Sequence, residues 1–122
     1  MKQITIHNLK DSSAQDVFDF IVGHLRTQGE SAHDEGRCVY RSAEGLTCAA
    51  GCLIPVEDYK PTFEDSSWYD VADAFKCHEH DNLIRDLQIV HDRFGSDEWE
   101  VELGKVAHSY MLKMPAFEEA AK

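Results

Sequence analysis

Apolar positions near the start of the chain recur at helical spacing. Ser12 and Gln15 form a capping-box pattern, and apolar residues follow three or four positions apart up to Gly29. These apolar residues are Ala14, Val17, Phe18, Ile21 and Leu25. The pattern predicts a first helix over 13–27 with one buried face.

Three more helical segments are predicted in the second half of the chain. Ser66 or Ser67 is placed to cap the first, Gly95 ends the second, and Ser96 caps the third. Their apolar stripes are Trp68, Val71, Ala72 and Phe75; Leu83, Ile84, Leu87, Val90 and Phe94; and Trp99, Leu103, Val106, Ala107 and Tyr110. Both tryptophans open a helix, where packing into the core is the favoured role.

Between these helical regions the pattern changes to short β-like runs. Residues 38–41 and 46–48 flank a turn over 42–45, which predicts a hairpin in which Arg41 faces Leu46 and Val39 faces Cys48. The small residues of 49–54 suit a close backbone approach, and 55–64 is expected to be an irregular connection.

Ile4 and Ile6 alternate with polar neighbours, a pattern typical of a short strand or an extended arm. The predicted fold class is therefore α+β: a short β-hairpin, with or without this N-terminal strand, packed against about four helices.

Length and composition limit the organisation of the chain. With 122 residues and 43% hydrophobic content, it suits a single domain over 1–122, with 115–122 as a loose tail. No apolar stretch approaches the roughly eighteen residues of a membrane span, and the N-terminus lacks the layout of a signal peptide. We therefore expect a cytoplasmic protein whose four cysteines are free thiols or metal ligands.

Acidic residues are in large excess, and they are unevenly distributed. The net charge is −11, and residues 57–102 alone hold fourteen acids against four bases. This balance disfavours direct binding to nucleic acid and favours a partner protein with a basic surface. The acids expected to contact such a partner are Glu57, Asp58, Glu64, Asp65, Asp70, Asp73, Asp97 and Glu98.

One stretch resembles a known motif. The chain has Cys38-Val39-Tyr40-Arg41, then Gly45, Cys48-Ala49, Gly51 and Leu53-Ile54-Pro55, with Leu87-Gln88 and His91-Asp92 further on. This is similar to a motif of small, mostly uncharacterised proteins of bacteriophages and prophages, and it covers residues 37–59 and 87–92. The resemblance implies a phage or prophage origin, and hence the cytoplasm of a host cell. It implies no activity, and Cys52 stands where that motif has an ordinary apolar residue.

Cysteine and histidine spacing raises the possibility of a zinc site. Cys48 and Cys52, together with Cys77 and His80, could supply four ligands of the type that zinc prefers. Against this, the first two lie in an apolar run of small residues, and free cysteines are among the most buried residues. Burial is the favoured interpretation, and no cofactor other than zinc is suggested.

Two other sites use the same region. Cys48 could be a nucleophile at a helix start with His91 as its base, although the sequence has no recognisable catalytic signature. Tyr40, Arg41, His91 and Asp92 could line a small pocket, or Arg41 could pair with Asp92 or Glu44 to brace the fold.

The sequence thus favours a small acidic accessory protein of phage type that binds a host protein, such as a nucleic-acid-binding or defence protein, through an acidic surface and modulates or inhibits it. The alternative is a zinc-binding or cysteine-dependent protein centred on Cys48, Cys52, Cys77 and His80. The oligomeric state is left open.

Overall fold

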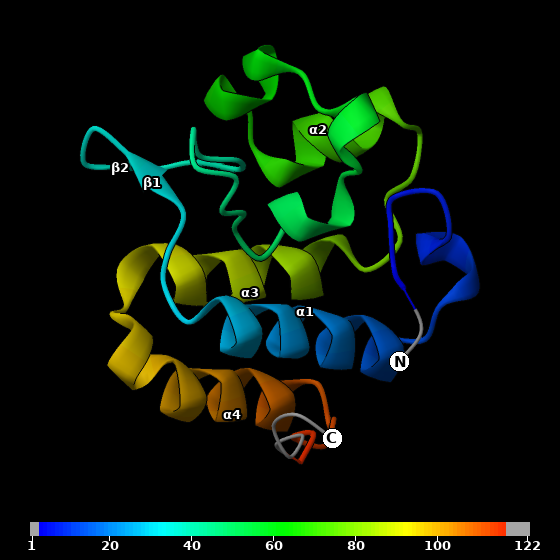
Figure 1. Cartoon of the computed structure of the whole chain (residues 1–122). Coiled ribbons are helices and arrows are strands. Elements are labelled where there is room, and N and C mark those ends of the chain that lie inside the picture. The colour runs from blue at the N-terminus through cyan, green and yellow to red at the C-terminus, as the bar shows by residue number, and fades with distance from the viewer. Residues whose placement is uncertain (1–2, 117–122) are drawn as a thin grey trace.

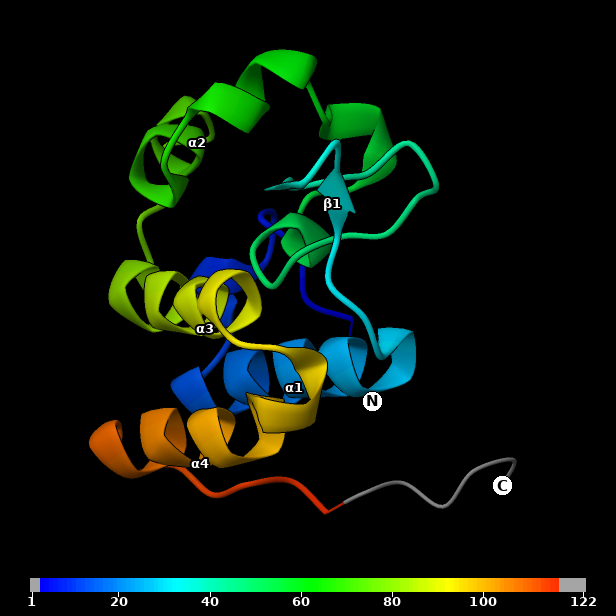
Figure 2. The ribbon, with the colours of Figure 1, turned by 90° about the vertical axis from the view of Figure 1, so that its left-hand side faces the viewer.

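A computed structural model describes residues 3–116 of the chain. Three helices form the lower layer: α1 (Ala14–Gln28), α3 (Asp81–Arg93) and α4 (Trp99–Ser109). The upper layer holds a two-stranded hairpin, several 3-10 helices and α2 (Trp68–Ala74). Figures 1 and 2 show the helical layer from two sides, with the other elements lying above it. The described residues thus form a small α+β fold, as the sequence predicts.

The helices form where the apolar stripes predict them. Ser13 rather than Ser12 caps α1, because its hydroxyl accepts a hydrogen bond from the Asp16 N–H at 3.0 Å. Gly29 ends this helix in the left-handed conformation (φ 74°), which glycine adopts readily. Ser67 caps α2 in the same way, with the Asp70 N–H at 3.2 Å.

The start of α4 differs from the prediction. Ser96 is the first residue of a 3-10 helix, η5 (Ser96–Glu98), that leads into α4, and Gly95 precedes it as the cap residue. The Glu98 carboxylate accepts a hydrogen bond from the Gly95 N–H at 3.3 Å, so the turn is closed by an acid rather than by a serine hydroxyl.

The hairpin lies earlier in the chain than predicted. It pairs β1 (His33–Asp34) with β2 (Arg37–Cys38), and the turn residues Glu35 and Gly36 both have positive φ. This is the backbone twist that favours a two-residue hairpin turn.

The predicted hairpin over 38–48 is reduced to one bridge, in which Arg41 pairs with Thr47. Gly45 adopts a positive φ of 89°, and Ser42 donates its N–H to the Leu46 carbonyl at 2.8 Å. The predicted register is therefore wrong by one residue: Arg41 faces Thr47 rather than Leu46.

The N-terminal segment is not a strand. Asn8 folds the chain back on itself, because its side chain accepts from the Thr5 N–H and donates to the Gln3 carbonyl, both at 2.9 Å. A short 3-10 helix, η1 (Leu9–Asp11), follows. Ile4 and Ile6 are nevertheless buried, as expected of an apolar arm.

The upper layer is built from 3-10 helices: η2 (Gly51–Leu53), η3 (Val56–Asp58) and η4 (Pro61–Asp65). A Cβ atom at Gly51 would lie 2.2 Å from the Tyr40 carbonyl oxygen, so only glycine fits there. The close approach predicted for the small-residue run is therefore confirmed. Trp68 and Trp99 are both 4% exposed, in agreement with a core role.

The C-terminal segment returns along α1. The Arg26 guanidinium donates to the Pro115 carbonyl at 2.9 Å and the Ala116 carbonyl at 3.3 Å. Of the tail predicted to be loose, these two residues are held by α1, and 117–122 lie outside the described residues. Within 3–116, no helix has both the length and the apolar character needed to cross a bilayer.

Candidate functional site

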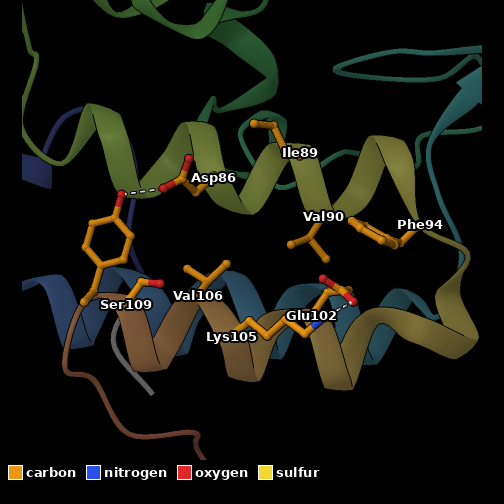
Figure 3. Close-up of a pocket in the computed structure, with 9 residues that line it drawn as sticks. Asp86, Ile89, Val90, Phe94, Glu102, Lys105, Val106 and Ser109 are labelled. Atoms are coloured by element: carbon orange, nitrogen blue, oxygen red, sulfur yellow. Dashed lines mark hydrogen bonds and ion pairs between the residues drawn. The ribbon is translucent and has the colours of Figure 1, made fainter.

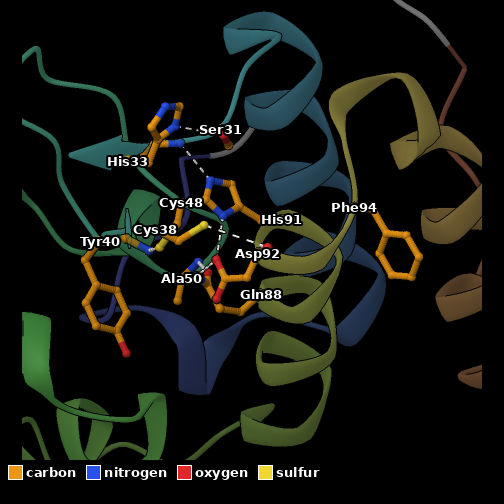
Figure 4. Close-up of polar contacts among 12 residues, drawn as sticks. Ser31, His33, Cys38, Tyr40, Cys48, Ala50, Gln88, His91, Asp92 and Phe94 are labelled. Atoms are coloured by element: carbon orange, nitrogen blue, oxygen red, sulfur yellow. Dashed lines mark hydrogen bonds and ion pairs between the residues drawn. The ribbon is translucent and has the colours of Figure 1, made fainter. Parts of the chain in front are cut away.

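His91 is the centre of a buried polar network between the helical layer and the hairpin. Its side chain is fully buried, and its ring stacks on Trp99 with a centroid distance of 5.8 Å. The Nε2 atom accepts a hydrogen bond from the Ala32 N–H at 2.9 Å, and Nδ1 lies 2.7 Å from the Asp92 carboxylate. Figure 4 shows His91 and Asp92 projecting from α3 toward the loop that contains Cys48, while Phe94 points away.

Gln88, one turn earlier on α3, extends this network. Its Nε2 donates to the Asp92 carboxylate at 2.9 Å, and its Oε1 accepts from the Ala50 N–H at 2.9 Å. The side chains of α3 thus satisfy two backbone N–H groups, at Ala32 and Ala50, on two different loops. Among the described residues no buried side-chain nitrogen or oxygen lacks a partner, so the network is closed.

The Ala32 contact fixes the protonation of His91. A backbone N–H can only donate, so Nε2 has no proton and Nδ1 of the neutral ring donates its proton to Asp92. Neither ring nitrogen is then free to take a proton from a thiol. The hypothesis of His91 as a catalytic base is therefore not supported by this geometry.

One metal-like cluster does occur in the part of the chain that the structure describes. Single ligand atoms of Cys38, His91 and Asp92 lie within 4.8 Å of one another. A metal bound to Nδ1 would move the ring proton to Nε2, where it would face the Ala32 N–H. Partial desolvation of the Cys38 thiol, with Asp92 adding to it, raises its pKa and disfavours the thiolate that a metal needs. These residues therefore fit a packing network better than a metal.

The predicted zinc ligands are not brought together: within 3–116, no three of Cys48, Cys52, Cys77 and His80 lie within metal-binding reach. The Cys48 thiol is buried and accepts from the Gly51 N–H at 3.1 Å, and the Cys52 thiol donates to the Ala49 carbonyl at 3.1 Å. Cys77 packs against the core, and His80 Nε2 donates to the Ser12 carbonyl at 2.7 Å. The spacing hypothesis fails because these side chains are already engaged in separate places.

Cys48 is also a poor nucleophile. Burial raises its pKa to about 12, although the Gly51 N–H acts in the opposite direction. The sequence predicts that oriented N–H groups would activate this thiol, but desolvation is the larger effect here.

Glu64 is a structural residue rather than a surface acid. Its two carboxylate oxygens accept from the Tyr40 N–H at 2.8 Å and the Arg41 N–H at 3.2 Å, and Tyr59 donates its hydroxyl at 2.5 Å. Burial, and then Glu64, raises the pKa of Tyr59 to about 12. The Glu64 carboxylate is therefore engaged within the fold, and its predicted contact with a partner stays a prediction.

The side chains of Tyr40 and Arg41 stabilise the region around Glu64. The Tyr40 hydroxyl donates to the Ser66 carbonyl at 2.8 Å, and burial is the main cause of its raised pKa. The Arg41 guanidinium lies over the Tyr59 ring at 5.9 Å, instead of pairing with Asp92 or Glu44. The bracing role predicted for Arg41 is thus present with a different partner.

The predicted acidic surface is divided between two ends of the molecule. We define the acidic layer as residues 56–74, which comprise η3, η4 and α2 and hold six acids against one base, Lys60. Asp97 and Glu98 lie in η5, which Figures 1 and 2 show at the opposite end, beside α4. The eight acids therefore do not share one face.

The acids of the acidic layer differ in whether they form ion pairs. Asp58 contacts His7 at 2.7 Å, and Asp73 contacts His78 at 3.0 Å. Asp65 is highly exposed and lies 3.9 Å from Arg37, which is also exposed. Glu57 and Asp70 are exposed, and neither belongs to an ion pair among the described residues.

A groove of about 220 Å³ runs between α3 and α4. Val90 and Val106 project into the space between the two helices, as Figure 3 shows, and Phe94 and Ile89 also line the groove. Its acids are engaged, since Asp86 accepts from the Tyr110 hydroxyl at 2.6 Å and Glu102 pairs with Lys105 at 3.1 Å. Nothing in the structure indicates an occupant.

Comparison of the chain with protein-family models, with curated proteins and with solved structures gives no match. The predicted phage origin therefore stays a prediction.

Proposed function

We propose that this chain is a non-enzymatic binding protein that docks its acidic layer on a basic surface of another protein. The observation that supports this most directly is the exposure of Asp65, Asp70 and Glu57 on one layer that has a single base. Carboxylates arranged in this way attract a basic partner and repel nucleic acid.

An exposed aromatic ring lies in the same layer. Tyr69 is 61% exposed, next to Asp70 on α2, whereas both tryptophans are buried. Tyrosine is a frequent anchor in interfaces, because it adds contact area with few rotatable bonds. A tyrosine among carboxylates suits a partner rich in arginine, whose guanidinium group can stack on the ring.

The cysteine and histidine side chains that could take part in catalysis are engaged within the fold, which favours a binding role over an enzymatic one. Cys48, Cys52 and His91 are occupied in packing and in hydrogen bonds to the backbone. As in the interpretation of the sequence, the proposed partner is a host protein that exposes a basic groove, such as a nucleic-acid-binding or defence protein. The proposed site of action is the cytoplasm of the host cell.

The test uses two double variants of equal charge change. Asp65→Asn with Asp70→Asn removes two charges from the acidic layer, and Asp97→Asn with Glu98→Gln removes two from η5. A basic protein is captured by the wild type from a bacterial lysate at low salt, purified, and titrated calorimetrically against all three chains.

Binding should weaken steeply between about 50 and 300 mM salt, because screening is strong over that range. It should also weaken several-fold in the acidic-layer variant and stay near the wild-type affinity in the η5 variant. An affinity that is insensitive to salt, equal losses in both variants, or no captured protein would contradict the proposal.

A further inference from the structure

The link between α2 and α3 contains a histidine held between two acids. His78 Nδ1 lies 2.6 Å from the Asp81 carboxylate, and Nε2 lies 3.0 Å from the Asp73 carboxylate. Its ring stacks on Tyr69 with a centroid distance of 4.3 Å. One ring therefore joins the C-terminal turn of α2 to the first residue of α3.

The backbone of this link adopts an unfavourable conformation on both sides of the histidine. Lys76 has φ 55° and His80 has φ 65°, and neither is a glycine. Residues other than glycine rarely adopt this left-handed backbone conformation, so other contacts must hold the link in place. The two carboxylate contacts of His78 are suited to do so.

The protonation state of His78 decides how many of these contacts exist. A carboxylate only accepts hydrogen bonds, so both contacts form only when both ring nitrogens have a proton. The charged groups facing the ring are Asp73 from α2 and Asp81 from α3, and both raise the pKa of His78. Asp81 is further fixed by the Trp68 indole N–H, which donates to it at 3.2 Å.

We propose that His78 is a pH-dependent latch between α2 and α3, closed as the imidazolium and half open as the neutral ring. The neutral ring keeps Asp81, which is the shorter contact and only 19% exposed, and releases Asp73, which is 71% exposed. Opening frees the carboxylate of Asp73 and loosens the ring against which Tyr69 stacks.

The direction of the pH effect follows from the raised pKa. Because the folded chain binds this proton more tightly than the unfolded chain, the latch is complete below 6.5, the ordinary pKa of histidine. Its contribution is lost as the pH rises through the higher pKa of the folded state. This consequence rests on the proposed function: at higher pH the acidic layer loses the neutralising positive charge of His78 beside Asp73, and it binds a basic partner more tightly.

The test is a proton NMR titration of the histidine ring resonances in the full chain, with His78→Asn used to assign the His78 signals. We expect the His78 midpoint to lie above 6.5 and to fall in the Asp73→Asn variant. A matched control is Asp70→Asn, because Asp70 lies on the same helix without contacting His78. A midpoint at or below 6.5, or one that Asp73→Asn leaves unchanged, would overturn the latch.

Hydrogen exchange of the amides of residues 75–80 provides a second measurement. Protection in the wild type, relative to His78→Asn, should be larger at low pH and decrease above the midpoint, where only the Asp81 contact is kept; a difference between the two chains that does not change with pH would overturn the proposal. Neither measurement uses a partner, so they can support the latch even if the acidic layer binds nothing. Conversely, partner binding with the same pH dependence in wild type and His78→Asn would refute the regulatory role and leave the proposed function intact.

Discussion

His91 and His78 both contact aspartate, but in opposite surroundings. The His91 ring is fully buried and has one carboxylate and one backbone N–H as partners. The His78 side chain is 35% exposed and has two carboxylates as partners. A donor facing one nitrogen keeps the first ring neutral, whereas two acceptors favour the charged form of the second. A contact between histidine and aspartate thus supports core packing at His91 and a charged surface group at His78.

Replacing His91 should have the largest effect. His91→Ala leaves the Ala32 N–H without its buried acceptor and opens space beside Trp99, so the loss of unfolding free energy should be about 3 kcal/mol. Urea unfolding monitored by tryptophan fluorescence measures it. The matched control His108→Ala, at an exposed position on α4, should change stability by less than about 0.5 kcal/mol. Similar losses in both would show that His91 is not a packing centre.

Replacing Glu64 should have the next largest effect. Glu64→Gln keeps the size but turns one acceptor into a donor that faces a backbone N–H, so it should cost about 1–2 kcal/mol. Its neighbour provides the control, because Asp65→Asn alters an acid that is 85% exposed and should be nearly neutral. If Asp65→Asn were the more destabilising change, our distinction between structural and surface acids would be wrong.

His24 should make stability depend on pH in the opposite sense to His78. Its Nε2 donates to the Thr47 carbonyl at 3.0 Å, and burial lowers its pKa below 6.5. The neutral form is therefore favoured by folding, so this contribution is complete above 6.5 and is lost as the pH falls below it. Thermal unfolding at pH 7 and at pH 5 should show a smaller decrease for His24→Gln than for the wild type. An equal decrease in both chains would exclude His24 as the cause.

Replacing Cys38 should have the smallest effect. Cys38 is an exposed residue, and its partly desolvated thiol donates a long hydrogen bond of 3.8 Å to the Asp92 carbonyl. Cys38→Ser should therefore change stability by less than about 0.5 kcal/mol. Added zinc should leave the melting temperature of both chains unchanged. A zinc-dependent rise that Cys38→Ser abolishes would show that the cluster of Cys38, His91 and Asp92 is a metal site.

The helices could be predicted from the sequence because their causes are local. The apolar stripe of α1, the hydroxyl of Ser67 and the glycine at position 29 all act within one or two turns. The position of the hairpin could not be predicted from the strand pattern, because it depends on the backbone conformation of single turn residues. Glu35 and Gly36 adopt positive φ together, and the bridge between Arg41 and Thr47 makes the turn between them one residue longer than predicted. The residue pattern of the strands does not encode these choices.

The site residues could be named from the sequence, but their partners could not. Tyr40, Arg41, His91 and Asp92 are all structurally engaged, yet some of the groups they contact lie far along the chain. Ala32 precedes His91 by 59 residues, and Glu64 follows Tyr40 by 24. The i,i+4 spacing of Gln88 and Asp92 on a predicted helix was a usable signal. No local signal marks Glu64, whose role depends on where η4 folds against the bridge of Arg41 and Thr47.

One nitrogen-15 NMR spectrum of the imidazole rings tests the contrast between the two histidines most directly. The two nitrogens of each ring report separately whether they have a proton, and the spectrum is recorded at about pH 6, where the raised pKa of His78 keeps that ring charged. We predict that His91 is protonated on Nδ1 alone and that His78 is protonated on both nitrogens. A proton on Nε2 of His91, or the same protonation state in both rings, would contradict the assignment of His91 to packing and His78 to the charged surface.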